Sequence, residues 1–229
     1  MASRNVTIEL DNATLSQLSK QGARLYVLRA VTSADRTGQP TVWYTNSALL
    51  ASNYVSWDAT YEAYISTDPL TAYEVVRPQS KTKIAPSQVA VISEPGTLTT
   101  QTGDLEGRFQ IENSSKTAYT CGIIGDSAVG GNYCAFHVTV GGLVVITPTD
   151  KVFFMFASQK FDVGTIILQS FGAGIIVDVP SGNTNLIFNI NSGWSVDMST
   201  NFELVAAGEK LQEKLIIPSQ MIFASQMQN

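Results

Sequence analysis

Residues 83–93 read KIAPSQVAVIS, and residues 215–225 read LIIPSQMIFAS. Each stretch places Pro-Ser-Gln between a short apolar run and a second run of apolar residues. A motif that recurs in matching surroundings indicates a repeated structural unit. The two stretches therefore predict an internal duplication, with one copy of the unit in each half of the chain.

Other segments echo one another in the same order along the chain. The order is preserved while the spacing drifts, as loop insertions in a duplicated β unit would produce, because loops tolerate length changes and strands do not. Chance similarity between two strand-rich segments is the alternative. The echoed pairs are residues 8–12 with 109–113, 25–30 with 152–157, 41–44 with 165–168, 55–58 with 176–178, and 73–76 with 202–205.

Short runs rich in Val, Ile, Tyr, Phe and Thr are separated by Gly, Pro, Asn and Asp over the whole chain. Strands at this spacing are typical of β-sandwiches and barrels. Helical signals are limited to residues 12–21 and 209–214, and neither segment holds a 3.6-residue period for long. We therefore predict an all-β fold of two tandem β-sandwich modules, related by internal duplication, with an insertion in the second.

The module boundary is predicted from composition. Residues 94–107 combine Pro, Gly and Thr with few large apolar residues, which is typical of a linker. Module one then covers residues 1–93, and module two covers 108–229 with extra strands around 114–150. The predicted strands include residues 72–76, 165–171 and 221–224, and the apolar run 163–179 is predicted to form a hairpin.

Charge and termini restrict the partners and the compartment. Only 14% of residues are charged, and the net charge is −5. This argues against nucleic-acid binding, which needs clustered Lys and Arg, and weakens attraction to anionic lipid, although contact with a membrane surface stays open. The first residues, MASRNV, lack the apolar core of a signal peptide, and no apolar run reaches the length of a transmembrane segment. We expect a cytoplasmic protein or one secreted without a leader.

Signals for catalysis are weak. His137 is the only histidine, so a histidine-cluster metal site is disfavoured. His137 and Cys134 differ by an odd number and would face opposite sides of a regular strand. We assign no catalytic residue, metal or cofactor, and whether any activity is catalytic stays open, with a non-enzyme favoured. Cys121 and Cys134 are expected to be free thiols in a reducing compartment, with a disulfide as the alternative.

Aromatic residues crowd into one segment of module one, together with Asn and Asp. Adjacent residues on a strand face opposite sides, so some of these rings must reach the surface or a groove. Aromatic faces beside short polar groups suit sugar recognition. Burial in the core or at a subunit contact is the alternative. The predicted ligand-binding residues are Trp43, Tyr44, Asn46, Tyr54, Trp57, Asp58 and Tyr61.

The functional expectation is a non-enzymatic binding protein. It would recognise a glycan or similar surface ligand in a lectin-like manner, assemble with itself as a homo-oligomer, or do both. A pore-forming β-toxin that uses residues 163–179 is the first alternative, although its unbroken apolar triplets fit strands buried on both faces better than membrane strands, which alternate. The second alternative is a carboxylate-dependent hydrolase or lyase using a pair among Asp58, Glu62, Asp162, Asp178 and Glu203.

Overall fold

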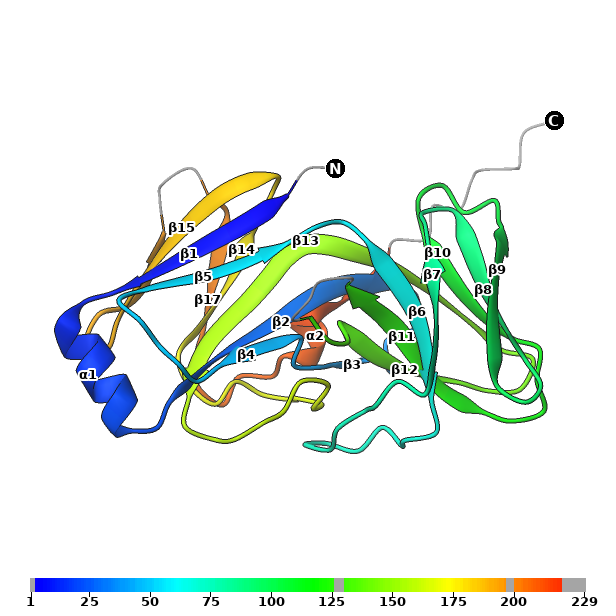
Figure 1. Ribbon diagram of the computed structural model, residues 1–229, viewed down its shortest axis with the longest axis horizontal. Helices are drawn as coiled ribbons and strands as arrows, with labels where there is room; N and C mark the ends of the chain where they lie inside the picture. Colours follow the sequence, from blue (N-terminus) through cyan, green and yellow to red (C-terminus); the bar gives the residue numbers. More distant parts are fainter. Residues whose placement is uncertain (1–2, 126–129, 197–199, 220–229) are drawn as a thin grey trace.

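The computed structural model describes residues 3–125, 130–196 and 200–219, and it consists mainly of β-strands in three sheets (Figure 1). The predicted all-β class is confirmed, and the arrangement is sandwich-like. Residues of all three sheets share the largest apolar cluster, because the two smaller sheets both pack on one face of a nine-stranded sheet. Among the described residues, no helix has the length and apolarity needed to cross a bilayer.

The four-stranded sheet forms one end of the sandwich, and its strands alternate strictly between the two faces. In the first strand Val6, Ile8 and Leu10 are buried, whereas Glu9 is exposed. This two-residue period directs one face toward the core and the other toward solvent. In spatial order the strands are β16 (Gly193–Val196), β15 (Gly182–Asn189), β1 (Arg4–Leu10) and β5 (Ser52–Trp57).

The nine-stranded sheet spans the length of the molecule, and its longest strand, β13, crosses from one end to the other (Figure 1). Both faces of its centre are buried, so β13 and β2 contain continuous apolar runs rather than alternating ones. The strands are β17 (Phe202–Val205), β14 (Gly174–Asp178), β13 (Leu143–Ala157), β10 (Phe109–Asn113), β8 (Gln88–Ser93), β9 (Thr97–Thr102), β2 (Arg24–Ser33), β4 (Tyr44–Asn46) and β18 (Ile216–Pro218).

The five-stranded sheet covers the other end of the same face. Its inner residues, such as Ile123 and Phe136, join the largest apolar cluster, while Tyr64 and Ala135 pack with Val76 and Ile166 in a separate small cluster. In spatial order its strands are β3 (Gln39–Pro40), β12 (Cys134–Val138), β11 (Tyr119–Gly125), β6 (Tyr61–Ser66) and β7 (Ser80–Ile84).

Two short helices complete the described part of the fold. Helix α1 (Asn12–Lys20) begins after Asp11, whose carboxylate accepts a hydrogen bond from the backbone N–H of Thr14 at 2.7 Å. That bond satisfies one of the free donors at the helix start and lowers the pKa of Asp11. Helix α2 (Gln212–Leu215) packs Leu215 against the outer face of the nine-stranded sheet.

Strand pairing does not follow the predicted module boundary. β1 pairs with β15 in parallel, β8 pairs with β10 in parallel, and β2 lies antiparallel to β13, so each of these pairs joins predicted module one to predicted module two. A strand pairs with whichever neighbour buries its apolar face, and sequence distance does not forbid it. Two tandem modules and an internal duplication are therefore not confirmed and stay predictions.

Three local expectations were wrong, and one falls outside the described residues. The predicted linker contains β9, which pairs with β8 in a hairpin and buries Leu98. The run 163–179 is not a hairpin, since β14 pairs with β13 and β17 instead. Residues 72–76 form only an isolated bridge, from Val75 to Thr165. The strand predicted at 221–224 lies outside the described part of the chain.

Candidate functional site

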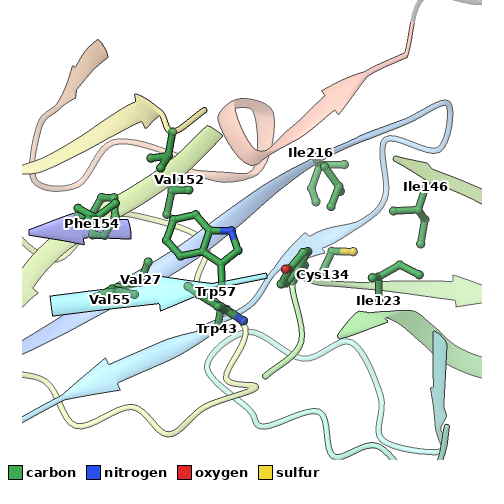
Figure 2. Close-up of a cluster of buried hydrophobic side chains, with 14 of the residues drawn as sticks. Val27, Trp43, Val55, Trp57, Ile123, Cys134, Ile146, Val152, Phe154 and Ile216 are labelled. Atoms are coloured by element: carbon green, nitrogen blue, oxygen red, sulfur yellow. The ribbon is translucent and has the colours of Figure 1, made fainter. Parts of the chain in front are cut away.

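The two tryptophans of the predicted binding set lie inside the sandwich. Trp43 is 1% exposed and Trp57 is 4% exposed, and both belong to the largest apolar cluster. Figure 2 shows the two rings beside each other among apolar side chains. Their centroids are 5.3 Å apart in an edge-to-face arrangement. Neither ring is therefore available at the surface to stack on a ligand.

A buried arginine packs against both of these rings. Arg29 on β2 is 2% exposed, and its Cζ lies 4.7 Å from the Trp57 ring centroid and 5.4 Å from that of Trp43. The ring of Tyr133 lies 4.7 Å from the same atom. Three electron-rich faces thus surround one cation, which is favourable when water is excluded. Burial still lowers the pKa of Arg29.

The other predicted residues of this segment are dispersed. Tyr54 is 60% exposed, because it lies on the solvent face of β5, opposite the face that buries Val55 and Trp57. Tyr44 is half-buried on β4, and the Asn46 carboxamide oxygen accepts a hydrogen bond from the backbone N–H of Ala48 at 2.9 Å. Asp58 follows β5 and is exposed.

Among the predicted rings, Tyr61 borders an open cavity. The cavity has a volume of about 530 Å³ and lies where β6 and β7 meet the β8–β9 hairpin. The Tyr61 ring is held in place by edge-to-face contacts with Phe109, at 5.1 Å, and Tyr133, at 6.2 Å. The cavity is lined by Ala59, Thr60, Tyr61, Lys83, Ile84, Ala85, Pro86, Gln88 and Thr100.

The lining of the Tyr61 cavity mixes apolar and hydrogen-bonding groups. Ile84, Ala85 and Pro86 supply apolar surface beside the Tyr61 ring, and Gln88 and Thr100 supply an amide and a hydroxyl. The Gln88 side-chain oxygen accepts a hydrogen bond from the backbone N–H of Ala85 at 2.8 Å. The volume is in the range of small-ligand sites, which are mostly apolar with a few polar groups.

The Pro-Ser-Gln motif builds one wall of this cavity. Ser87 has a φ of 67°, a left-handed conformation that is uncommon for serine. Three hydrogen bonds hold it there: its N–H donates to the Arg108 carbonyl at 2.9 Å, its carbonyl accepts from Gly103 at 2.9 Å, and its Oγ accepts from Gly107 at 2.8 Å. The turn presents Pro86 and Gln88 to the cavity. In the second copy of the motif, Pro218 also borders a cavity, of about 390 Å³.

The candidate catalytic groups do not form a reactive pair. Cys121 and Cys134 are buried free thiols. Burial raises the pKa of both, that of Cys134 to about 12, so neither is a thiolate near neutral pH. His137 points to solvent from β12 and lines a separate cavity beside Tyr119. Among the described residues, no three His, Cys, Asp or Glu side chains are grouped so as to hold a metal ion.

The candidate acids are tied into surface ion pairs or lie apart. Glu62 accepts from Lys81 at 2.9 Å, Asp178 lies 3.7 Å from Lys151, and Glu203 pairs with Lys214. Asp58 and Asp162 are exposed to solvent. An exposed ion pair of this kind contributes little to stability and is an ordinary surface feature.

Sequence reasoning missed the remaining cavity residues and one exposed ring. Lys83, Pro86, Gln88 and Thr100 were not predicted, although the Pro-Ser-Gln motif itself pointed to two of them. Tyr73 is 44% exposed at a φ of 67°, with its ring near-parallel to that of Phe161 at 6.2 Å. No pattern in the sequence indicates that Tyr73 adopts a left-handed backbone conformation.

No protein-family model matches the chain, and no match is found among curated proteins or among solved structures. The fold and the geometry of its cavities are therefore the evidence from which a function can be argued.

Proposed function

We propose that this chain is a non-enzymatic binding protein that recognises an oligosaccharide in the Tyr61 cavity. The observation that carries the proposal is the lining of that cavity, which combines one fixed aromatic ring with an amide, hydroxyl groups and an ammonium group. A pyranose has an apolar C–H face and a rim of hydroxyls, so it needs this combination of ring and polar groups.

Each part of the cavity has a role in this proposal. The Tyr61 ring offers a face for the C–H bonds of a sugar, and its contacts with Phe109 and Tyr133 fix its orientation before the ligand arrives. Gln88 and Thr100 pair with hydroxyl groups, and Lys83 donates to a hydroxyl or a carboxylate at the rim. Pre-positioned groups bind more tightly because less conformational entropy is lost on binding.

The strained turn at Ser87 supports a site at this position. A non-glycine residue in the left-handed region costs on the order of 1–3 kcal/mol, and such residues cluster at functional sites. Three hydrogen bonds hold this turn in place, and it directs Pro86 and Gln88 into the cavity. In this proposal, the Ser87 turn forms one wall of the Tyr61 cavity before the ligand binds.

The test is a substitution that fills the cavity without touching the core. Thr100 is exposed on β9 and lines the cavity, so Thr100→Arg should block a sugar and leave the free energy of unfolding within about 0.5 kcal/mol. Thr99→Arg on the opposite face of the same strand is the matched control. Binding is measured on an array of immobilised neutral and acidic oligosaccharides.

The expected outcome is retention by the native chain and by Thr99→Arg, with at least a tenfold loss in Thr100→Arg. The proposal fails if the native chain retains no oligosaccharide above background. It also fails if Thr100→Arg binds as tightly as the control, because the ligand would then occupy another surface.

Self-association is a second candidate function, favoured by one edge strand. β17 ends the nine-stranded sheet and exposes Phe202 and Leu204 on one face. An apolar edge strand is a template for pairing with another chain, and a charge on it prevents that pairing. Sedimentation velocity should show an oligomer for the native chain and a monomer for Leu204→Lys. A monomeric native chain at all concentrations would remove this candidate.

A further inference from the structure

Four buried N–H groups at the Arg29 cluster have no hydrogen-bond acceptor among the described residues. The cluster is defined here as Arg4, Arg29, Trp43, Trp57 and Tyr133. The unpaired donors are Nε of Arg4, Nε of Arg29, and the indole Nε1 atoms of Trp43 and Trp57. Buried polar groups are almost always paired, so each exception points to an ordered water or ion.

These donors belong to residues that are neighbours in the interior. Arg29 lies over the Trp57 ring, and the ring centroids of Trp43 and Trp57 are 5.3 Å apart. Arg4 on β1 is directly opposite Trp57 on β5 in the strand register. The cluster therefore joins the four-stranded sheet to β2 of the nine-stranded sheet.

The cluster also holds more positive than negative charge. Its nearby carboxylate, Asp150, accepts a hydrogen bond from Nη2 of Arg4 at 2.7 Å and is half exposed. Arg29 instead donates to two neutral oxygens, the Tyr133 hydroxyl at 3.4 Å and the Thr149 carbonyl at 3.1 Å. Within residues 3–125, 130–196 and 200–219, no carboxylate pairs with the buried guanidinium of Arg29. A buried charge without a counter-ion is strongly unfavourable.

The unpaired donors and the excess positive charge together indicate the chemistry of the partner. The unpaired atoms are all donors, so the partner must offer lone pairs, which excludes a cation and an apolar group. A water molecule would accept the hydrogen bonds and leave the charge uncompensated. We propose that a small inorganic anion of halide size binds inside the Arg29 cluster, accepting N–H groups from Arg29 and Trp57. This site is separate from the Tyr61 cavity and does not depend on the proposed function.

Crystals soaked in sodium bromide test the site directly. An anomalous difference peak should appear within hydrogen-bonding distance of Nε of Arg29 and of the Trp57 indole nitrogen. An ordered water at this position, with no anomalous signal, would overturn the proposal. So would bromide peaks confined to the protein surface.

Thermal unfolding provides the test in solution. The Tm of the native chain should rise with chloride concentration when sodium chloride replaces sodium gluconate at constant ionic strength, because gluconate is too large for an enclosed site. Arg29→Met should abolish this dependence. Arg36→Met, which removes an exposed guanidinium, should retain it.

If Arg29→Met does not fold, Trp57→Phe keeps a ring beside Arg29 and removes one donor. The chloride concentration that produces half of the Tm shift should then increase several-fold. A native Tm that is equal in both salts, or a chloride dependence that is unchanged in both variants, would contradict anion binding.

Discussion

Trp57 and Tyr61 are four residues apart in the same aromatic stretch, yet they lie in different physical environments. Trp57 ends β5 with its ring in the interior against Arg29, whereas Tyr61 begins β6 with its ring bordering an open cavity. The strands belong to different small sheets, and the turn between them carries the chain from the core to the cavity wall. A high density of rings therefore marks a region of packing, whereas position at a sheet junction decides which ring can meet a ligand.

The largest effect is expected from removing a buried ring. Trp43→Ala should lower the free energy of unfolding by about 3–5 kcal/mol, because it leaves a cavity and exposes Arg29 to an unfilled space. Urea denaturation followed by far-UV circular dichroism measures this change. A loss below about 1 kcal/mol would show that the Arg29 cluster is not part of a packed core.

A smaller effect is expected from the two buried thiols, which pack in the same cluster as Trp43. Burial raises the pKa of Cys121 and raises that of Cys134 to about 12, whereas the thiols of the unfolded chain ionise near 9. Between these values the unfolded chain holds fewer protons than the folded chain, so stability is complete below pH 9 and falls as the pH rises. Each thiol should contribute a loss of about 1.4 kcal/mol per pH unit in this window.

Urea denaturation at pH 8 and at pH 10 measures the thiol effect. The double variant Cys121→Ala and Cys134→Ala is the control, and it should lose less stability between the two pH values than the native chain does. Equal losses in the two proteins would mean that the thiols are accessible to solvent in the folded state.

The smallest effect is expected at the exposed ring. Tyr54→Ala should change the free energy of unfolding by less than about 0.5 kcal/mol and leave oligosaccharide retention unchanged, because Tyr54 faces solvent on β5, away from the Tyr61 cavity. The oligosaccharide array and urea denaturation check both expectations. Loss of retention in this variant would move the binding surface to the outer face of the four-stranded sheet.

The elements that could be predicted share a strong local pattern. β5 alternates buried and exposed residues, and β1 alternates over its length, so both strands were evident from the sequence. The Thr-rich strand β9 was mistaken for a linker, because threonine is common both in strands and in flexible segments and only its pairing with β8 distinguishes them. The parallel pairing of β1 with β15 could not be foreseen, since the two strands are far apart in sequence. The pairing of β8 with β10 was missed because the two strands were predicted to belong to separate modules.

The candidate site was predicted only where its residues carry a local sequence signal. Tyr61 was in the predicted set, and the Pro-Ser-Gln motif marked the turn that supplies Pro86 and Gln88. Thr100 comes from β9, in the segment predicted as a linker, so its place in the same cavity depends on the β8–β9 hairpin.

The amino-acid sequence by itself determined that this chain forms strands and which side chains share a face of each strand, because the two-residue period is a local property of the backbone. Only the tertiary structure decided which face is covered and by what. It buried Trp43 and Trp57 around Arg29 and left Tyr61 at an open junction of two sheets. Those outcomes depend on contacts between distant segments, such as Arg29 with Tyr133, which are 104 residues apart. Such contacts are selected by how all the apolar faces can be buried together.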